Sequence, residues 1–153
     1  MGTYFNGNST GLYVTAQTNS STTYVTVSRS VAAYGTGGFA TASTGTNATT
    51  RLFITESLVD SNVNLGVGAY TTVGATGQVS EVSVSNSLIV GNGTALRSTG
   101  TGSKFVASGN TVINNTYGLM QEAPSVFESA GNNTVRNNGT NVVNPPLTNI
   151  GTM

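Results

Sequence analysis

Residues 82–92 read Val-Ser-Val-Ser-Asn-Ser-Leu-Ile-Val-Gly-Asn, and copies of this stretch recur along the chain without internal gaps. Earlier copies begin at Val25 and Leu52, and a later one begins at Phe105. A partial copy begins at Ala130. Recurrence every few tens of residues is typical of stacked structural units, each of which buries its apolar face against its neighbours.

The spacing of the repeat predicts how the units connect. The last Asn or Gly of each copy falls at positions 8, 35, 62, 92, 115 and 138, in steps of 27, 27, 30, 23 and 23 residues. Constant spacing inside the motif and variable spacing outside it predict stacked coils with loops of variable length at one corner. We expect these loops at residues 43–50, 71–77 and 99–103. An apolar residue follows each copy by four positions, except that Leu65 follows Asn62 by three.

The composition favours β-structure. Gly, Ser, Thr and Asn make up 81 of the 153 residues, and five basic side chains balance five acidic ones. Disordered chains usually combine low hydrophobicity with high net charge, whereas this chain is 37% hydrophobic with no formal net charge. Helix formers are scarce and β-branched Val and Thr are common. The sequence therefore predicts an all-β protein with little or no helix.

Aligning the copies predicts which side chains point inward. In a stack of parallel coils, each position lies about 4.8 Å above the same position in the next coil. Alternation along each strand then predicts three inward apolar columns. Their members are Val25, Leu52, Val82 and Phe105; Val27, Ile54, Val84 and Ala107; and Ala32, Val59, Ile89, Val112 and Val135.

The Asn at the end of each copy forms a column of its own. Stacked side-chain amides bond to one another along such a column, and Asn tolerates the left-handed backbone that we expect at this bend. The predicted structural ladder consists of Asn62, Asn92, Asn115 and Asn138. A row of amides that binds a ligand is the alternative interpretation.

Three motifs carry a resemblance to a known family. They are V-x-V-S-x-S-x-I-x-x-N, N-N-T-Y-G-L at 114–119, and N-G-T at 92–94 and 138–140. With them the chain resembles bacterial right-handed parallel β-helix repeat proteins of the pectate-lyase-like superfamily. The resemblance implies a single-stranded right-handed parallel β-helix (solenoid) of about five to six coils. It also implies an extracellular or cell-surface location.

The chain is expected to be one β-helix domain over residues 1–153. Coil repeats cover about 5–143, and a C-terminal capping tail follows at 144–153. Two prolines, Pro145 and Pro146, are predicted to stop the stack, because proline cannot continue a ladder, and to fold Leu147 and Ile150 over its end.

Outward columns hold the candidate ligand-binding residues. One is predicted to run Tyr24, Arg51, Glu81 and Lys104, with charges that alternate between coils. Such pairs fix strand register, and Arg29 above Glu56 is expected to form another. The alternative is a sugar-binding face, because Phe53 lies on the same sheet as Tyr24 and aromatic rings beside charged donors can hold sugar rings.

The residue types argue against an enzyme. The chain has neither His nor Cys, which excludes the usual general base and a thiol nucleophile. Family relatives hold Ca²⁺ with several carboxylates, but here one Asp and four Glu do not stack on adjacent coils. Glu122 and Glu128 bracket Pro124 and are expected to be solvated loop charges. We predict no catalytic set, no metal and no cofactor.

Partners are limited by charge and hydropathy. Because the charge is balanced, we expect no nucleic-acid binding. The sequence has no run of 18 apolar residues, so no membrane-spanning helix is predicted. No secretory signal pattern opens the chain. The first coil begins almost at once, with apolar Tyr4 and Phe5, and no cap precedes it. The favoured interpretation is a fragment of a longer β-helix protein, and the alternative is end-to-end self-association through this coil.

Two functional hypotheses follow. The first is a non-catalytic β-helix module with a structural, adhesive or surface-display role, within a longer extracellular protein. The second is a carbohydrate-binding or carbohydrate-active domain, which would take a polysaccharide as its partner. Because this fold hosts many functions, the repeat itself does not choose between them.

Overall fold

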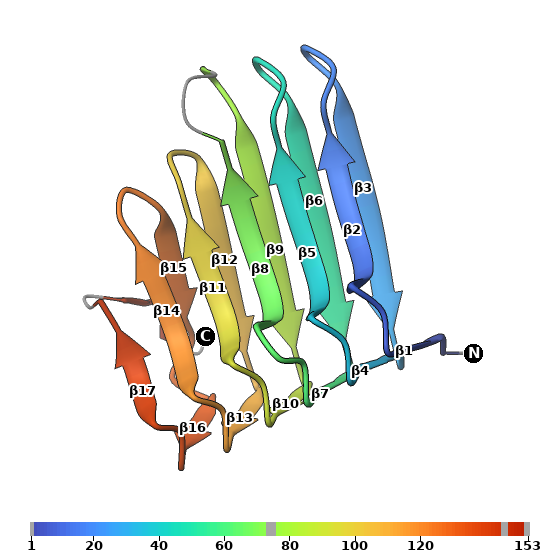
Figure 1. Ribbon diagram of the computed structural model, residues 1–153. Helices are drawn as coiled ribbons and strands as arrows, with labels where there is room; N and C mark the ends of the chain where they lie inside the picture. The colour runs from blue at the N-terminus through green and yellow to red at the C-terminus, as the bar shows by residue number, and fades with distance from the viewer. Residues whose placement is uncertain (1, 73–75, 145–146, 152–153) are drawn as a thin grey trace.

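In the computed structural model, residues 2–72, 76–144 and 147–151 are described, and they form eighteen strands and no helix. Three parallel sheets of six strands each stack as a β-solenoid (Figure 1). Strands three apart in sequence are neighbours, so each turn of the chain contributes one strand to each sheet. The predicted all-β solenoid is confirmed.

Each coil contains one strand of each sheet. The base sheet consists of β1 (Tyr4–Asn6), β4 (Val31–Ala33), β7 (Leu58–Asp60), β10 (Leu88–Val90), β13 (Thr111–Ile113) and β16 (Thr134–Arg136). The first leg sheet consists of β2 (Thr10–Ala16), β5 (Gly37–Ser43), β8 (Leu65–Thr71), β11 (Thr94–Thr99), β14 (Tyr117–Glu122) and β17 (Thr140–Val143). The second leg sheet consists of β3 (Thr22–Ser28), β6 (Thr49–Thr55), β9 (Val79–Ser85), β12 (Ser103–Ser108), β15 (Val126–Ser129) and β18 (Thr148–Asn149).

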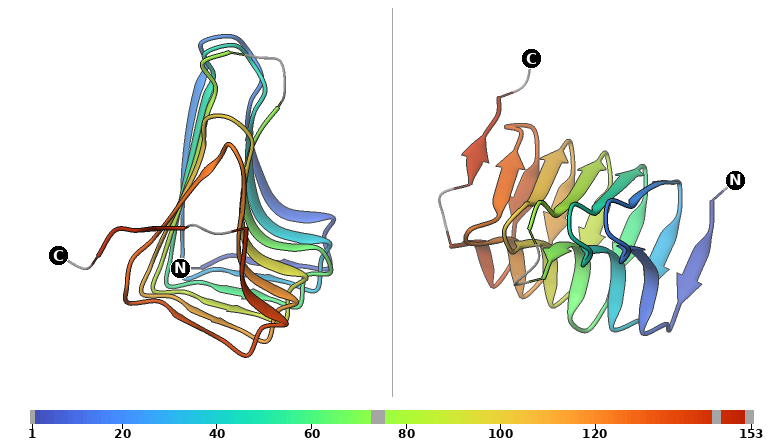
Figure 2. Two further views of the ribbon diagram at one scale, coloured as in Figure 1. Left: turned by 90° about the vertical axis from the view of Figure 1, so that its left-hand side faces the viewer. Right: turned by 90° about the horizontal axis from the view of Figure 1, so that it is seen from above.

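Seen along its axis, the solenoid is a triangle with a narrow apex (Figure 2). The short strands form the base, and the two leg sheets rise to loops at the apex. These loops are the variable corner predicted from the repeat spacing, although residues 73–75 of one loop lie outside the described residues. The apex is high in the first coils and lower in the later ones, so the solenoid tapers toward its C-terminal end (Figure 2).

The predicted apolar columns are confirmed. Leu52 pairs with Val82, which pairs with Phe105, and the column continues to Phe127. The rings of Phe105 and Phe127 stack with their centroids 4.8 Å apart. Near the apex the legs come close together, and small hydroxyl side chains replace apolar ones. Buried Ser43 there bonds the Thr50 hydroxyl at 3.0 Å.

The asparagine ladder is present. The Oδ1 atom of Asn92 accepts hydrogen bonds from the backbone N and from Nδ2 of Asn62, at 3.0 and 2.9 Å. Asn115 accepts the same two bonds from Asn92, at 2.8 and 3.1 Å. Asn138 accepts them from Asn115, both at 2.9 Å. The column therefore satisfies buried amide groups and links successive coils.

The prediction that the ladder residues themselves have a left-handed backbone is wrong. The residue before each ladder Asn has it instead. Ser61, Gly91 and Asn114 have φ values of 51°, 69° and 57°. The left-handed residue turns the chain at the bend, and the following Asn can then project its amide inward.

A second ladder, which the sequence analysis missed, lines the other end of the base sheet. Ser30 N donates to Ser57 Oγ at 3.2 Å, and Ser57 N donates to Ser87 Oγ at 3.1 Å. Asn110 and Asn133 continue the column. Ser30, Ser57, Ser87 and Asn110 also follow left-handed residues, so in these coils both bends beside the short strands are built in the same way.

One extra residue in the third coil overturns a predicted alignment. Val67, rather than Leu65, pairs with Phe39 and Leu96 in the inward column. Leu65 pairs with Gly37 instead. The additional residue is accommodated in the bend after Asn62, where Val63 is 75% exposed. The inserted residue lies between β7 and β8, so the parallel pairing of β8 with β5 and β11 continues without interruption.

The C-terminal end differs in part from the expectation. Leu147 packs against the core, as predicted, but Ile150 is 42% exposed and does not cover the end. Strand β18 (Thr148–Asn149) pairs with β15 and so adds to the second leg sheet. The predicted role of Pro145 and Pro146 lies outside the described residues.

Candidate functional site

The predicted ligand-binding residues share the outer face of the second leg sheet. We call the outward side chains of Tyr24, Arg51, Phe53, Glu81 and Lys104 the Tyr24 face. Arg51 joins its two neighbours in the column: Nη1 donates to the Tyr24 hydroxyl at 2.6 Å, and Nε donates to Glu81 Oε2 at 2.9 Å. The Arg51 guanidinium also lies 5.4 Å from the Tyr24 ring centroid. The hydrogen bond to Glu81 raises the pKa of Arg51.

Lys104 does not continue this chain of contacts. Its Nζ lies 3.0 Å from Glu128 Oε2, on the strand beyond it. Lys104 stands between Glu81 and Val126 in its column, and Glu81 already bonds Arg51. The ammonium group therefore pairs diagonally with Glu128, and the expected ion pairing along the column stops at Glu81.

The aromatic members of the Tyr24 face are accessible. Tyr24 is 59% exposed and Phe53 is 41% exposed, and they project from adjacent strands. Phe53 lies one position along the outward row from Arg51. The structure thus gathers the five predicted residues on one face. Arg51 bonds both Tyr24 and Glu81, whereas Lys104 pairs with Glu128. Phe53 is exposed on the same strand as Arg51. Among the described residues Arg29 and Glu56 occupy one column but form no ion pair, because both are left-handed bend residues.

A second polar cluster lies on the outer face of the first leg sheet. The Arg97 cluster comprises Tyr70, Arg97, Thr99 and Glu122. Arg97 Nη2 donates to both Glu122 carboxylate oxygens, at 2.8 and 2.7 Å. Thr99 Oγ1 donates to Glu122 Oε2 at 3.0 Å. Sequence reasoning placed Glu122 in a solvated loop, whereas it ends β14 and is held by two side chains of β11.

The environment of this cluster shifts three pKa values. Burial would raise the pKa of Glu122, but hydrogen bonds from Arg97 and Thr99 outweigh it, and the pKa lies below its ordinary value. Burial opposes the charge of Arg97 as well, yet the bond to Glu122 raises its pKa. Burial raises the pKa of Tyr70, which keeps its phenol neutral. The cluster is therefore a charge-balanced pair beside an uncharged ring.

The Tyr70 ring closes over a glycine. A Cβ atom at Gly68 would lie 2.5 Å from the Tyr70 ring, so a larger residue there would displace the ring from this position. The Arg97 guanidinium lies 5.7 Å from the Tyr70 ring centroid. The spacing of Arg97 and Glu122, on neighbouring strands two positions apart, was the available sequence signal.

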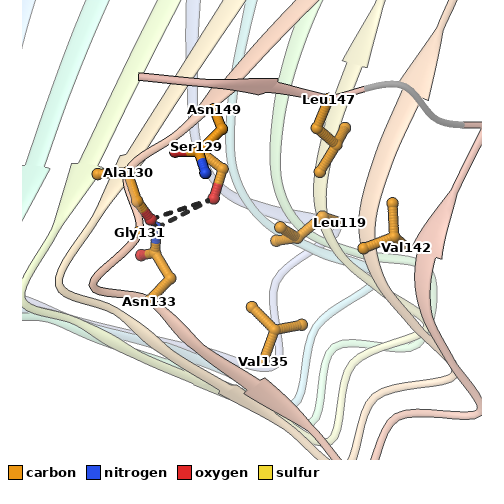
Figure 3. Close-up of a pocket in the computed structure, with 9 residues that line it drawn as sticks. All are labelled: Leu119, Ser129, Ala130, Gly131, Asn133, Val135, Val142, Leu147 and Asn149. Atoms are coloured by element: carbon orange, nitrogen blue, oxygen red, sulfur yellow. Dashed lines mark hydrogen bonds between the residues drawn. The ribbon is translucent and has the colours of Figure 1, made fainter. Parts of the chain in front are cut away.

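A shallow hollow of about 400 Å³ opens beside Arg97. Its walls include Asn64, Thr94 and Tyr117, of which Tyr117 is 40% exposed. Two further hollows lie at the two ends of the solenoid, where core side chains are only partly covered. The C-terminal hollow, of about 260 Å³, is lined by Leu119, Val135 and Leu147 among others (Figure 3).

Within residues 2–72, 76–144 and 147–151, no three acidic side chains gather as a metal site would require. The same residues contain no helix that is long and apolar enough to cross a membrane. Neither family models, nor curated proteins, nor solved structures yield a match to this chain.

Proposed function

We propose that this protein is a non-catalytic β-solenoid module with a structural, adhesive or surface-display role. The observation that carries the proposal is the state of three of its five acidic side chains. Glu81, Glu122 and Glu128 each pair with a basic side chain of a neighbouring strand. A general acid or base needs a carboxyl group that is free to exchange a proton with substrate. These three instead fix the register of the outer faces.

The continuous core and its two ladders support the same role. Each coil is bonded to the next through backbone, buried amides and hydroxyls, so the module is a rigid spacer. The extracellular or cell-surface location belongs to the proposal and rests on the sequence resemblance. A longer extracellular protein would supply the context for such a spacer.

Carbohydrate binding is the second candidate, and the exposure of Tyr24 and Phe53 favours it. Two accessible rings on adjacent strands, with Arg51 beside them, can stack on sugar rings and donate hydrogen bonds. The ligand class would be a polysaccharide, bound along the Tyr24 face.

A glycan array and a polysaccharide depolymerisation assay, each with and without Ca²⁺, test both candidates. We expect no depolymerisation under either condition, and chain cleavage would overturn the non-catalytic proposal. If the array shows binding, the Tyr24→Ala/Phe53→Ala variant should lose it and Tyr117→Ala should retain it. Binding that survives in the double variant would exclude the Tyr24 face.

A further inference from the structure

We propose that the N-terminal end of the solenoid binds a second copy of the chain, so that two copies meet face to face around a twofold axis. The surface consists of the first coil, formed by β1, β2 and β3. Within the part of the chain that the structure describes, each of these strands is the last in its sheet and has one edge without a partner strand.

The first coil leaves the core open. Phe5, Leu12 and Val25 line a hollow of about 290 Å³ at this end. These side chains are only partly buried, whereas Phe39 and Leu52, one coil further along the same columns, are 0% exposed. A surface that continues the core in this way gains free energy when another apolar surface covers it.

The edges of the first coil carry none of the usual protection. Natural proteins blunt exposed strand edges with charged residues, prolines or covering segments. The first charged residue of the chain is Arg29, so β1, β2 and β3 contain no charged side chain and no proline. Backbone groups along these edges are therefore open to pairing with another strand.

Each strand of the first coil also presents one exposed tyrosine. Tyr4, Tyr13 and Tyr24 are 60%, 55% and 59% exposed, and they stand on the three sheets around the open end. Tyrosine is enriched in protein–protein interfaces, where it adds contact area at low entropic cost, while charged residues are depleted.

The shape of the coil fits a second copy of itself. Strands β2 and β3 both have seven residues and flank the apex, and Thr23 Oγ1 bonds the Thr15 carbonyl at 3.1 Å, so they run level. A twofold axis through the apex and the middle of β1 exchanges β2 with β3. Each edge then meets an antiparallel partner of its own length. Pairing 3, 7 and 7 residues gives about 17 backbone hydrogen bonds, against about 10 in an ordinary interface.

The C-terminal end does not offer the same match, which disfavours head-to-tail stacking. Strands β17 and β18 have four and two residues, far shorter than β2 and β3. Asn141 Oδ1 accepts bonds from the backbone N and Nδ2 of Asn138, at 3.3 and 3.0 Å. The ladder is thus closed at this end by a residue of the same coil.

Sedimentation velocity on the purified chain over a wide concentration range tests the proposal. We expect a concentration-dependent species of twice the 15.5 kDa chain mass. The twofold axis places β2 of one copy beside β3 of the other. Along these strands, Tyr13 of one copy and Tyr24 of the other are then offset by about one residue. In the Tyr13→Lys/Tyr24→Lys variant like charges then face each other, and the dissociation constant should rise at least a hundredfold. The Tyr13→Lys/Tyr24→Glu variant should restore association in a salt-sensitive manner.

The control is Tyr117→Lys, an exposed tyrosine of β14 that lies away from this end. It should associate like the wild type, and circular dichroism should show the same β-structure in all variants. A monomer at every concentration would overturn the proposal and leave another protein segment as the occupant. Open-ended polymers would overturn the twofold arrangement in favour of head-to-tail contacts. Either failure leaves the non-catalytic proposal standing, because that proposal depends on the outer faces.

Discussion

Asn115 uses every polar atom of its side chain. Its Oδ1 accepts two bonds from Asn92, and its Nδ2 donates to the carbonyls of Ile89 and Ile113 and to Asn138 Oδ1. Truncation leaves buried donors without acceptors, which costs more than the net value of the bonds themselves. We expect Asn115→Ala to lower the free energy of unfolding by about 1–3 kcal/mol in urea titrations.

A neighbouring exposed residue supplies the control for this substitution. Thr116 follows Asn115 and its side chain is exposed. Thr116→Ala should change the free energy of unfolding by less than about 0.5 kcal/mol. Equal losses in the two variants would mean that the amide column contributes no more than local packing does.

Glu122 gives the stability of the protein a dependence on acid. Its pKa in the fold lies below the ordinary value of 4.5, so its contribution is fully present above that pH. The contribution is lost as the pH falls through the lowered pKa of the folded state. Thermal unfolding measured from pH 7 to pH 2 should show this loss in the wild type.

The Glu122→Gln variant should have a shallower acid dependence. At pH 7 we expect it to be less stable by about 1 kcal/mol, because Arg97 loses its charged partner. At the acid end of the range the two proteins should converge. Parallel pH profiles would show that Glu122 is not linked to folding.

At the level of single residues, a column of the stack could be predicted from the sequence where the same residue type recurs from coil to coil. The Asn column could be found because the same amide recurs in four coils. The second ladder was missed because its members change from Ser to Asn along the stack, while their acceptor role stays the same. Arg97 was missed for the opposite reason: its partner Glu122 lies on the next strand and two positions along, where a straight column does not reach.

Along each strand of the leg sheets, side chains point alternately inward and outward. Substituting two adjacent residues tests this alternation. Val84 is 0% exposed in the core, whereas Ser83 beside it is half-buried on the outer face. Val84→Asp places an uncompensated charge in the core, a cost comparable to the whole stability of a domain. We expect circular dichroism to show an unfolded chain.

The matched variant Ser83→Asp puts the same charge one residue away on the other face. It should remain folded, with a thermal midpoint close to that of the wild type. If both variants fold, or both unfold, the inward assignment of Val84 is incorrect.

The bends constrain residue choice more than the strands do. Glu56 has a φ of 49° and no ion-pair partner among the described residues, and the equivalent Gly109 has a φ of 66°. Glycine adopts this backbone without strain, whereas other residues lose about 1–2 kcal/mol. After allowing for the entropy of glycine in the unfolded chain, Glu56→Gly should stabilise the fold by about 0.5–1 kcal/mol in urea titrations.

The sign of that change separates two interpretations of the same column. An ion pair between Arg29 and Glu56, as their stacking suggested, would make the glycine variant less stable. Relief of the strain in the left-handed backbone would make the glycine variant more stable. Repeating the titration with Arg29→Gly should give an effect of the same sign and similar size, because Arg29 has a φ of 47°.

Strand register was predictable wherever the repeat length was constant. It failed at the bend after Asn62, because one inserted residue shifts every later position until the next copy begins. The apolar pattern alone offered Leu65 as the inward residue, and only strand pairing reveals that Val67 takes that place. Loops at the apex escaped this problem, since their length does not alter the register of the strands below them.

At the scale of the whole molecule, stability should vary along the stack. Coils in the middle bond neighbours on both sides, whereas the first and last bond one neighbour only. Hydrogen exchange followed by mass spectrometry should find β8, β9 and β11 slowest and β16 to β18 fastest in dilute solution. Uniform exchange would instead indicate that the stack opens as a single unit.

The amide ladder has a direction. Every Asn in it accepts with its oxygen from the preceding coil and donates with its nitrogen to the following one. On a ribosome, which makes the N-terminal coil first, each finished coil holds donors that await an oxygen not yet synthesised. A growing stack is therefore always one acceptor short, until Asn141 supplies its oxygen to Asn138 from three residues away. The chain is therefore synthesised in the same direction in which the ladder donates its hydrogen bonds. At the last ladder residue, Asn138, the acceptor comes from the Asn141 side chain of the same coil and not from a further coil.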